Sequence, residues 1–233
     1  MKVAVMQPYF FPYLGYFQMF GAVDKFVLLD DVNFIMRGYI NRNSILVNGA
    51  AHKFSIPLEK ASQNKLINET KLNFPEKEKQ SFLKMIECAY KKAPYYGGFY
   101  PVLADIINYP QNDLTLFLKY AFEKIKQYLA LDTEILISSE IEKDNSLRAQ
   151  DRIIAINKAL GATTYINAIG GQELYNAADF KKENIELKFI QMDKIEYKQF
   201  KNNFVANLSM IDVLMFNSPQ ETKVLLNQYK LIA

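Results

Sequence analysis

The sequence has little of the side chains that most often hold metals, carry out redox chemistry or act as imidazole bases. Among its 233 residues there is one cysteine, one histidine and no tryptophan. Cys88 therefore cannot form an internal disulfide, and its apolar helical position predicts a core residue, which disfavours a thioester mechanism. The scattered acids have no partner histidines to form a metal site. No histidine or cysteine lies near Ser138 and Ser139 in sequence to suggest a hydrolase triad.

A strong net charge and a long apolar run are also absent. The 28 basic and 25 acidic residues leave a formal charge of +3, which does not indicate a DNA partner but is compatible with a small anionic ligand. No signal peptide begins the chain, and no segment is long and apolar enough to enter a membrane. We therefore expect a cytoplasmic protein without membrane insertion.

Apolar and aromatic side chains are abundant instead. The chain has 15 tyrosines and 17 phenylalanines, and half of its residues are apolar. A chain of this length and composition can bury one large core, so we expect a single domain over residues 1–233. No linker-like segment and no internal repeat divides it. The many phenols are available for the lining of a cleft.

The first 16 residues predict a strand, a loop bracketed by prolines and the start of a helix, in that order. Residues 3–6 are apolar, two prolines then prevent a continuing strand, and from Tyr13 the apolar residues recur at helical spacing. A helix start that follows a strand offers free N–H groups to an anion, and Gly15 would let a ligand approach the backbone. Tyr13 and Tyr16 are expected either to contact this ligand or to fill the core.

A second apolar run, residues 25–29, ends in Asp30 and Asp31. It predicts a buried parallel strand, and open α/β sheets bind their ligands at the carboxyl ends of such strands. One of these carboxylates could have a raised pKa and act as a general base. Alternatively, one could cap a turn while the other is solvated.

The segment that follows these aspartates mixes positive, amide and aromatic side chains within a dozen residues. Its candidate ligand-binding side chains are Arg37, Asn41, Arg42 and Asn43. The arginines could hold a pyrophosphate through bidentate contacts, or they could pair with Asp30 and Asp31 and fix the loop. After a turn at 48–49, residues 52–58 and 70–72 predict short strands. His52 begins the first of these and is either a structural side chain or a base.

A helical layer is predicted from residue 74 to about residue 130, inserted within the α/β domain. Apolar spacing predicts helices over 76–90, 100–107 and 114–129, with turn signals between them and Asp113 as a candidate N-cap. This layer could be a lid or the contact face of a homodimer, because both have the same periodicity.

The last hundred residues return to alternating strands and helices. Strands are predicted over 134–137, 163–166 and 186–190, and helices over 146–161, near 172–180 and over 209–217. Ser138 and Ser139 follow the first of these strands and either contact a ligand hydroxyl or belong to an ordinary loop. Ser146 is predicted to cap the first helix and Asp212 to complement the dipole of the last. Parallel βα units are the simplest assembly, giving an α/β fold with a mostly parallel open sheet.

Several of these blocks together resemble the WbqC-like protein family over nearly the whole chain. They are Gln7 to Tyr16, Asp30 to Val32 with Phe34 and Arg37, Asn41 to Asn43, Ser138 with Ser139, Tyr165 before Gly170, and Leu208 to Asp212. The resemblance implies a role in bacterial surface-polysaccharide (O-antigen) biosynthesis and an aminoacyl transfer, glycyl in particular, onto a nucleotide-linked amino sugar. It adds Gln7, Pro8 and Gly170 to the candidate substrate-binding residues. The family often has a tryptophan after the second proline, where this chain has Tyr13.

A more distant similarity concerns the nucleotidyltransferases and class I aminoacyl-tRNA synthetases, which share a Rossmann-like sheet. Their His-x-Gly-His signature follows the first strand, where this chain has Tyr13-Leu14-Gly15-Tyr16. A phenol is neutral near pH 7 and stabilises less developing charge than an imidazolium, so adenylation by that chemistry is not expected. Binding of a nucleotide without cleavage stays open.

These observations lead to three functional hypotheses. The first is a transferase that moves an aminoacyl or acyl group to the amine of a nucleotide-linked sugar. Its donor could be an acyl-CoA, an aminoacyl-tRNA or a carrier-protein thioester, and no cofactor is evident. The second is a non-catalytic protein that binds a nucleotide sugar or assembles a complex. The third, a nucleotidyltransferase-like enzyme, lacks the signature histidines.

Overall fold

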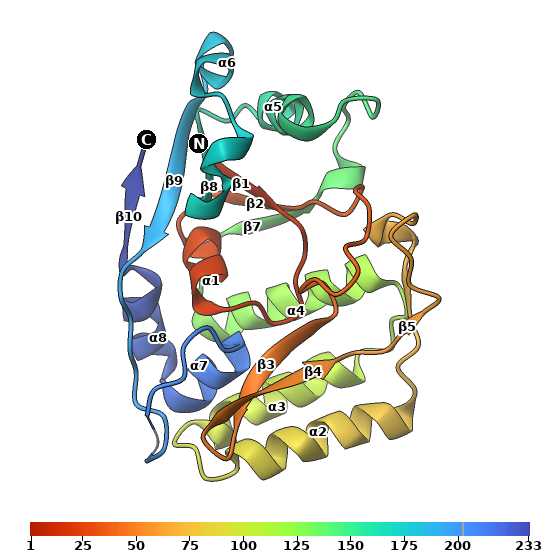
Figure 1. Cartoon of the computed structure of the whole chain (residues 1–233), viewed down its shortest axis with the longest axis vertical. Coiled ribbons are helices and arrows are strands. Elements are labelled where there is room, and N and C mark those ends of the chain that lie inside the picture. The colour runs from red at the N-terminus through yellow and green to blue at the C-terminus, as the bar shows by residue number, and fades with distance from the viewer. Residues whose placement is uncertain (202) are drawn as a thin grey trace.

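The core of the protein is a six-stranded sheet, seen in a computed structural model that describes residues 1–201 and 203–233 (Figure 1). Its order is β10-β9-β8-β1-β2-β7. The strands are β1 (Lys2–Met6), β2 (Lys25–Leu28), β7 (Glu134–Ile137), β8 (Thr164–Ala168), β9 (Glu186–Met192) and β10 (Tyr229–Ile232). All neighbours are parallel except β10, which is antiparallel to β9. The predicted α/β fold with a mostly parallel open sheet is confirmed.

The order in which the chain adds strands to the sheet changes direction at β1. It runs from β1 outward to β2 and β7, and then returns to β8 and β9 on the other side of β1. Open α/β sheets bind ligands beyond the carboxyl ends of their strands at such a reversal. The loops that follow β1, β2, β7 and β8 therefore define the edge at which a site is expected.

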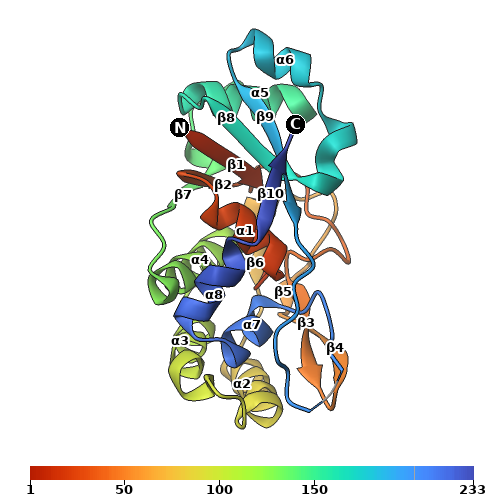
Figure 2. The same cartoon turned by 90° about the vertical axis from the view of Figure 1, so that its left-hand side faces the viewer.

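Strands β1 and β2 are buried on both faces because helices cover each side of the sheet, as Figures 1 and 2 show. Val3 and Val5 of β1 pack on the side of α5 (Ala149–Ala159) and α6 (Ala177–Lys182). Ala4 faces the larger cluster, which includes α1 (Leu14–Gly21) and α4 (Leu114–Leu129). A strand buried on both faces needs apolar residues at successive positions, which explains the continuous apolar runs in the sequence.

The segment between β2 and β7 forms two small sheets and three helices. These are the hairpin β3 (Arg42–Val47) and β4 (Ala50–Ser55), the pair β5 (Leu58–Glu59) and β6 (Lys71–Leu72), the short η1 (Ile67–Glu69), and helices α2 (Glu76–Tyr90), α3 (Tyr96–Asn108) and α4. The predicted bounds of α2 and α4 are confirmed, and Asp113 caps α4 by accepting a bond from the Leu116 N–H at 3.1 Å. Whether this layer acts as a lid or a dimer face stays a prediction.

The remaining elements complete the cover of the sheet. They are η2 (Ser138–Glu140), η3 (Ile169–Leu174), α7 (Met210–Phe216) and α8 (Pro219–Leu226). Ser209 caps α7 by accepting a bond from the Ile211 N–H, as predicted. None of the helices in the described ranges combines the length and apolar character that a membrane span requires.

Four local predictions differ from the structure. Residues 42–47 form β3, because they pair with β4 along their whole length and bury Asn43, Ile45 and Leu46. Helix α3 begins at Tyr96, so the two glycines expected to mark a turn lie within it. Helix α5 begins after Arg148 without a cap from Ser146, and the helix expected near 172–180 is divided into η3 and α6.

The predicted core position of Cys88 is also wrong. Its side chain is exposed. Helix α2 buries Phe82, Ile86 and Tyr90, which recur every four residues and define its inner face. Position 88 lies outside this row, so helical periodicity directs the thiol away from the core.

Candidate functional site

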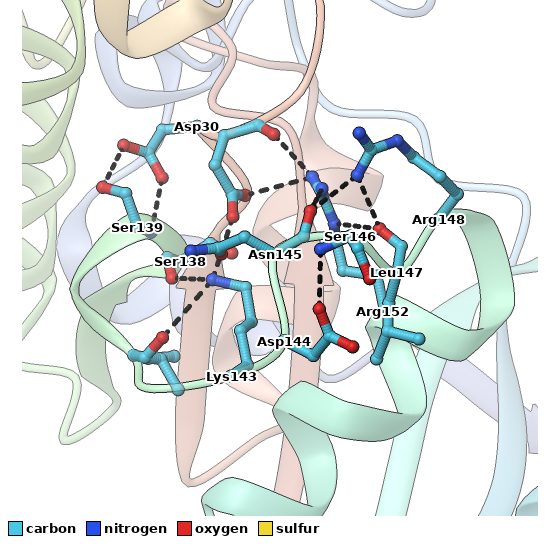
Figure 3. Close-up of polar contacts among 12 residues, drawn as sticks. Asp30, Ser138, Ser139, Lys143, Asp144, Asn145, Ser146, Leu147, Arg148 and Arg152 are labelled. Carbon is cyan, nitrogen blue, oxygen red and sulfur yellow. Dashed lines mark hydrogen bonds and ion pairs between the residues drawn. The ribbon is translucent and has the colours of Figure 1, made fainter.

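The carboxyl ends of β2 and β7 bring together two pairs of predicted site residues. Leu28 of β2 is in register with Ile137 of β7. The residues that follow, Asp30 and Asp31 on one strand and Ser138 and Ser139 on the other, therefore meet at the sheet edge (Figure 3). Parallel pairing places the residues that follow each of these strands at the same edge of the sheet.

Asp30 is a buried carboxylate whose two oxygens are both occupied. Ser139 donates its backbone N–H to Oδ1 at 2.9 Å and its hydroxyl to Oδ2 at 2.7 Å. Burial raises the pKa of Asp30, and the neighbouring charge of Asp31 raises it further, against the lowering effect of the Ser139 bonds. Asp30 thus fixes η2 to β2 and holds the exposed Ser139 hydroxyl in one orientation.

Asp31 has the opposite electrostatic environment. The Nζ of Lys143 lies 2.9 Å from Oδ2, and Nη1 of Arg152 lies 3.8 Å from Oδ1 and also donates to the Asp31 carbonyl at 2.5 Å. Burial would raise the pKa of Asp31, but Lys143, the Ser138 hydroxyl and Arg152 together hold it below its usual value. Asp31 is therefore ionised at neutral pH.

Two further groups complete this cluster. The Lys143 side chain is only 1% exposed, and it also donates to the Ser138 carbonyl. The Ser138 hydroxyl is buried next to the Asp31 carboxylate and helps to lower the pKa of that carboxyl. It therefore belongs to the same buried polar network as Lys143.

A pocket of about 410 Å³ opens beside these residues. Its polar lining consists of Asp31, Asn33, Asn68, Ser139, Asn145, Arg148 and Arg152. Arg148 is exposed and donates to the Asn145 carbonyl at 2.7 Å, which positions its guanidinium at the pocket. Amides both donate and accept hydrogen bonds, whereas a guanidinium binds anions. This combination suits a ligand with hydroxyl groups and a phosphate. We call this cavity of about 410 Å³ the edge pocket.

The loop after β1 lies at the point where the sheet reverses. Tyr13 precedes α1 and is 38% exposed, whereas Tyr16 is buried and donates its hydroxyl to the Gln7 carbonyl at 2.8 Å. The structure thus places Tyr16 in the core and Tyr13 at the surface. A Cβ at Gly15 would meet the Tyr13 ring at 2.6 Å, so the absent side chain makes room for that ring. Pro8 is buried in the same loop.

Exposed apolar side chains gather around this edge. Most of the large ones in the described residues lie in segments that follow β1, β2 or β8, or at the end of β9: Tyr13, Ile35, Met36, Tyr39, Ile169, Leu174 and Met192. Burial raises the pKa values of Tyr9 and Tyr13, and the nearby phenols raise them further, so both phenols stay protonated donors at neutral pH. The exposed apolar side chains listed above, together with these two phenol donors, are typical of a binding surface next to a polar pocket.

Other predicted ligand contacts hold the β2–β3 segment together. Arg42 donates through Nε to the Gly38 carbonyl at 2.8 Å, and the Asn41 amide donates to the Ile56 carbonyl at 2.9 Å. Asn43 is buried and donates to the Phe11 carbonyl at 2.7 Å. Within the described part of the chain, neither Arg42 nor the exposed Arg37 forms an ion pair with Asp30 or Asp31, where Lys143 and Arg152 take that place.

His52 and Gly170 lie apart from the Asp30–Ser139 cluster. His52 is exposed on β4, opposite Ile45 in the hairpin. Gly170 is exposed on η3, which follows β8 on the other side of β1. The predicted site residues thus lie at several separate places, of which the ends of β2 and β7 form the polar cluster described above.

Sequence analysis missed the cations and amides of the edge pocket. Lys143 comes from the connection between β7 and α5, Arg148 is the residue just before that helix, and Arg152 lies in its first turn. Because Arg148 and Arg152 are four residues apart, both lie on one face of the helix start, next to the carboxyl end of a strand. This spacing is the signal that could have identified them.

Asp212 lies in the first turn of α7, where it was predicted to complement the helix dipole, and its carboxylate also receives three hydrogen bonds from other segments. It is fully buried and accepts bonds of 2.7 Å from the hydroxyls of Tyr90 and Tyr197 and from the Gln199 amide. Burial raises the pKa of Asp212, against the lowering effect of these three donors. No group of three potential metal ligands occurs in the ranges that the structure describes.

Comparisons with known proteins show that most of this sequence resembles other chains. The model of the WbqC-like protein family matches residues 7–224. The Uncharacterized protein Rv1507c of Mycobacterium tuberculosis is 25% identical over 219 residues, which cover 93% of each chain. No solved structure matches the chain significantly. The family match includes the loops that follow all five parallel strands and therefore the whole candidate site.

Proposed function

This chain belongs to the WbqC-like protein family, and from this premise we propose that it is a transferase acting on a nucleotide-linked amino sugar. The group transferred to the sugar amine is an aminoacyl or acyl group, such as glycyl, in the biosynthesis of a bacterial surface polysaccharide. The edge pocket is the observation that supports this proposal best. It joins amide side chains, an exposed arginine and an ionised carboxylate at the carboxyl ends of parallel strands.

Two kinds of side chain in the edge pocket match two parts of such a substrate. The amides of Asn33, Asn68 and Asn145 suit sugar hydroxyls, because an amide can donate and accept at once. Arg148 suits the phosphate next to the sugar. Asp31, which stays ionised between Lys143 and Arg152, fixes these two cations beside the pocket.

The amine must lose a proton before it can attack an acyl donor, because an ammonium has no free electron pair. In our proposal the Ser139 hydroxyl oxygen accepts that proton while its own proton passes to Oδ2 of Asp30, 2.7 Å away. The raised pKa of Asp30 makes it a better proton acceptor than Asp31. The neutral amine then bonds to the acyl carbon as the bond from that carbon to the donor's leaving group breaks, and the leaving group takes up the second proton of the amine.

An acceptor assay tests the proposal directly. The purified protein is incubated with UDP- or dTDP-linked amino sugars and with acyl-CoA or aminoacyl-tRNA donors, and the sugar nucleotide is analysed by mass spectrometry. We expect the mass to increase by one acyl group in at least one combination. The rate should fall strongly in Ser139→Ala and Arg148→Ala. Lys158→Ala, which removes a positive charge at the other end of α5, should keep the wild-type rate.

Absence of a mass increase with every combination, with a well-folded wild-type protein, would exclude the transferase. The same panel in a thermal-shift experiment reports ligand binding separately, because a ligand that binds only the folded state raises its stability. Stabilisation by a sugar nucleotide that Arg148→Ala loses would retain the edge pocket as a binding site.

A non-catalytic binding protein is the second candidate, and the geometry of Asp30 favours it. Both oxygens of Asp30 are occupied by Ser139, and Asp31 is neutralised by two cations, as in a network built to stabilise a loop. This candidate predicts that Asp30→Asn keeps the affinity for a sugar nucleotide while wild type shows no turnover.

Nucleotidyl transfer ranks third. It would need a phosphate-binding group at the position of Tyr16, whose buried hydroxyl is bonded to the Gln7 carbonyl instead. Release of pyrophosphate from ATP or CTP would be its specific readout.

A further inference from the structure

A second hollow, larger than the edge pocket, lies between the turn of the β3–β4 hairpin and the carboxyl end of α2. Its volume is about 700 Å³, which is within the range of small-molecule sites. Figure 1 shows that the hairpin and α2 lie well away from the ends of β2 and β7. None of the residues that line it belongs to the edge pocket.

The titratable groups around this hollow are basic, apart from one thiol. Lys91, Lys92 and Lys201 line it together with His52, and no aspartate or glutamate does. None of these lysines forms an ion pair within the described ranges. Glu87 is close enough for the charge of Lys91 to lower its pKa slightly. Its carboxylate, however, forms an ion pair with Lys84 at 2.8 Å and not with Lys91. Three lysines without acidic partners create a local positive potential for an anion.

The floor of the hollow is apolar. Leu46 is 1% exposed, and the side chains of Val47, Met85, Ala89 and Phe200 are partly buried around it. A flexible methionine and an aromatic ring adapt easily to an aliphatic chain. The hollow thus combines an apolar floor with a basic rim, and we call it the basic pocket.

We propose that the basic pocket binds an amphiphilic phosphate ester. The phosphate is held by Lys91, Lys92 and Lys201, because lysine ammonium groups bind phosphate as point charges. The apolar chain of the ligand lies on Leu46 and Met85. A neutral ligand would leave the lysine charges uncompensated, and inorganic phosphate would leave the apolar floor in water. This proposal does not depend on transfer at the edge pocket.

Cys88 provides a local readout, since it lines the basic pocket, is exposed, and is the one cysteine in the sequence. The experiment measures binding of octyl phosphate by calorimetry and the rate at which iodoacetamide alkylates Cys88. We expect saturable 1:1 binding, slower alkylation in the complex, and much weaker binding of inorganic phosphate or octanol alone. Reversal of one rim charge in Lys92→Glu should weaken binding by about tenfold.

Lys77→Glu is the matched control, because it makes the same charge change at the other end of α2. It should keep the wild-type affinity and the protection of Cys88. Equal affinity in wild type and Lys92→Glu, or binding that leaves the alkylation rate unchanged, would overturn the proposal. So would the absence of binding to a folded wild-type protein.

Competition identifies the natural source of the phosphate ester. Octanoyl-coenzyme A represents a soluble ester, and phosphatidylcholine vesicles containing phosphatidic acid represent a lipid headgroup. Displacement of octyl phosphate by either one supports the proposal and assigns the source. Failure of both to displace it would overturn the assignment to a natural phosphate ester.

Discussion

Asp30 and Asp31 are adjacent in sequence, yet their environments shift their pKa values in opposite directions. Asp30 receives only the neutral donors of Ser139, so burial dominates and raises its pKa. Asp31 is also buried, but Lys143 and Arg152 are close enough to overcome that effect. Two neighbouring carboxylates can therefore serve as a proton acceptor and as a fixed negative charge.

The lowered pKa of Asp31 predicts a loss of stability in acid. Between the folded and the unfolded pKa the unfolded chain binds more protons, so the free energy of unfolding falls as the pH drops below about 4. Asp31→Asn should lose this part of the pH dependence. It should also be less stable at pH 7 by roughly 3–5 kcal/mol, because two buried cations lose their partner.

Urea unfolding between pH 2.5 and 7 measures both effects of Asp31→Asn. Asp132→Asn, which changes an exposed loop carboxylate, is the control and should follow wild type. If Asp31→Asn kept the same slope against pH as wild type, the ion pairs would not hold the pKa of Asp31 down.

At the scale of single residues, sequence analysis predicted the acids and hydroxyls of the site but not their cations. Asp31 and its partner Arg152 are separated by 121 residues, and no local pattern links them. Local patterns also could not assign a role to Tyr16, which the sequence allowed either to fill the core or to contact a ligand. Only packing shows that its hydroxyl faces the Gln7 carbonyl.

Helix α4 ends at a residue with a strained backbone conformation. Ala130 follows the helix with φ 44° and ψ 60°, in the left-handed region that favours glycine. Its backbone N–H still bonds to the carbonyls of the last turn, as in a normal helix end. The side chain of Ala130 therefore adds strain without adding a contact that ends the helix.

Ala130→Gly is accordingly predicted to stabilise the protein by about 0.5–1 kcal/mol. The matched control is Ala159→Gly in the last turn of α5, where right-handed helical geometry makes glycine destabilising by a similar amount. Thermal unfolding should move the two midpoints in opposite directions. A lower midpoint for Ala130→Gly would show that its left-handed conformation is not strained.

At the scale of elements, periodicity predicted long amphipathic helices well and short elements poorly. The bounds of α2 and α4 follow from apolar faces that continue for four turns. Arg42 and Asn43 make strand β3 hard to predict, because they continue the polar composition of the loop before it. Helix α5 begins after Arg148 without a side-chain cap, so a capping pattern at Ser146 does not mark its start.

Asp212 connects distant parts of the whole molecule. Its carboxylate binds Tyr90 of α2 and both Tyr197 and Gln199 of the segment before α7. Tyr90 also accepts the N–H of Leu46 from the hairpin. One buried carboxylate thus holds the hairpin, a helix of the inserted layer and the C-terminal part of the chain together, with neutral donors alone.

The raised pKa of Asp212 predicts the opposite pH dependence from that of Asp31. Between its unfolded and folded pKa the native state binds more protons, so the free energy of unfolding from this group falls as the pH rises through that window. Asp212→Asn should lose this component. The difference in stability between wild type and Asp212→Asn, measured by urea unfolding, should therefore change most between pH 4 and the folded pKa.

Tyr197→Phe provides the control for Asp212, because it removes one donor and keeps the carboxylate. We expect it to raise the pKa of Asp212 further and to extend the window to higher pH. A pH dependence that is identical in wild type and Asp212→Asn would show that Asp212 does not titrate in the folded protein.

Local sequence patterns were sufficient to predict the α/β class, the parallel strands and the long helices. These follow from local patterns, since a strand buried on both faces and an amphipathic helix each impose a period on neighbouring residues. Tertiary structure alone decided which cations neutralise Asp31, which tyrosine reaches the surface and which donors surround Asp212. Those contacts join residues up to 122 positions apart, so they depend on how complete elements pack and not on the order of residues within any one of them.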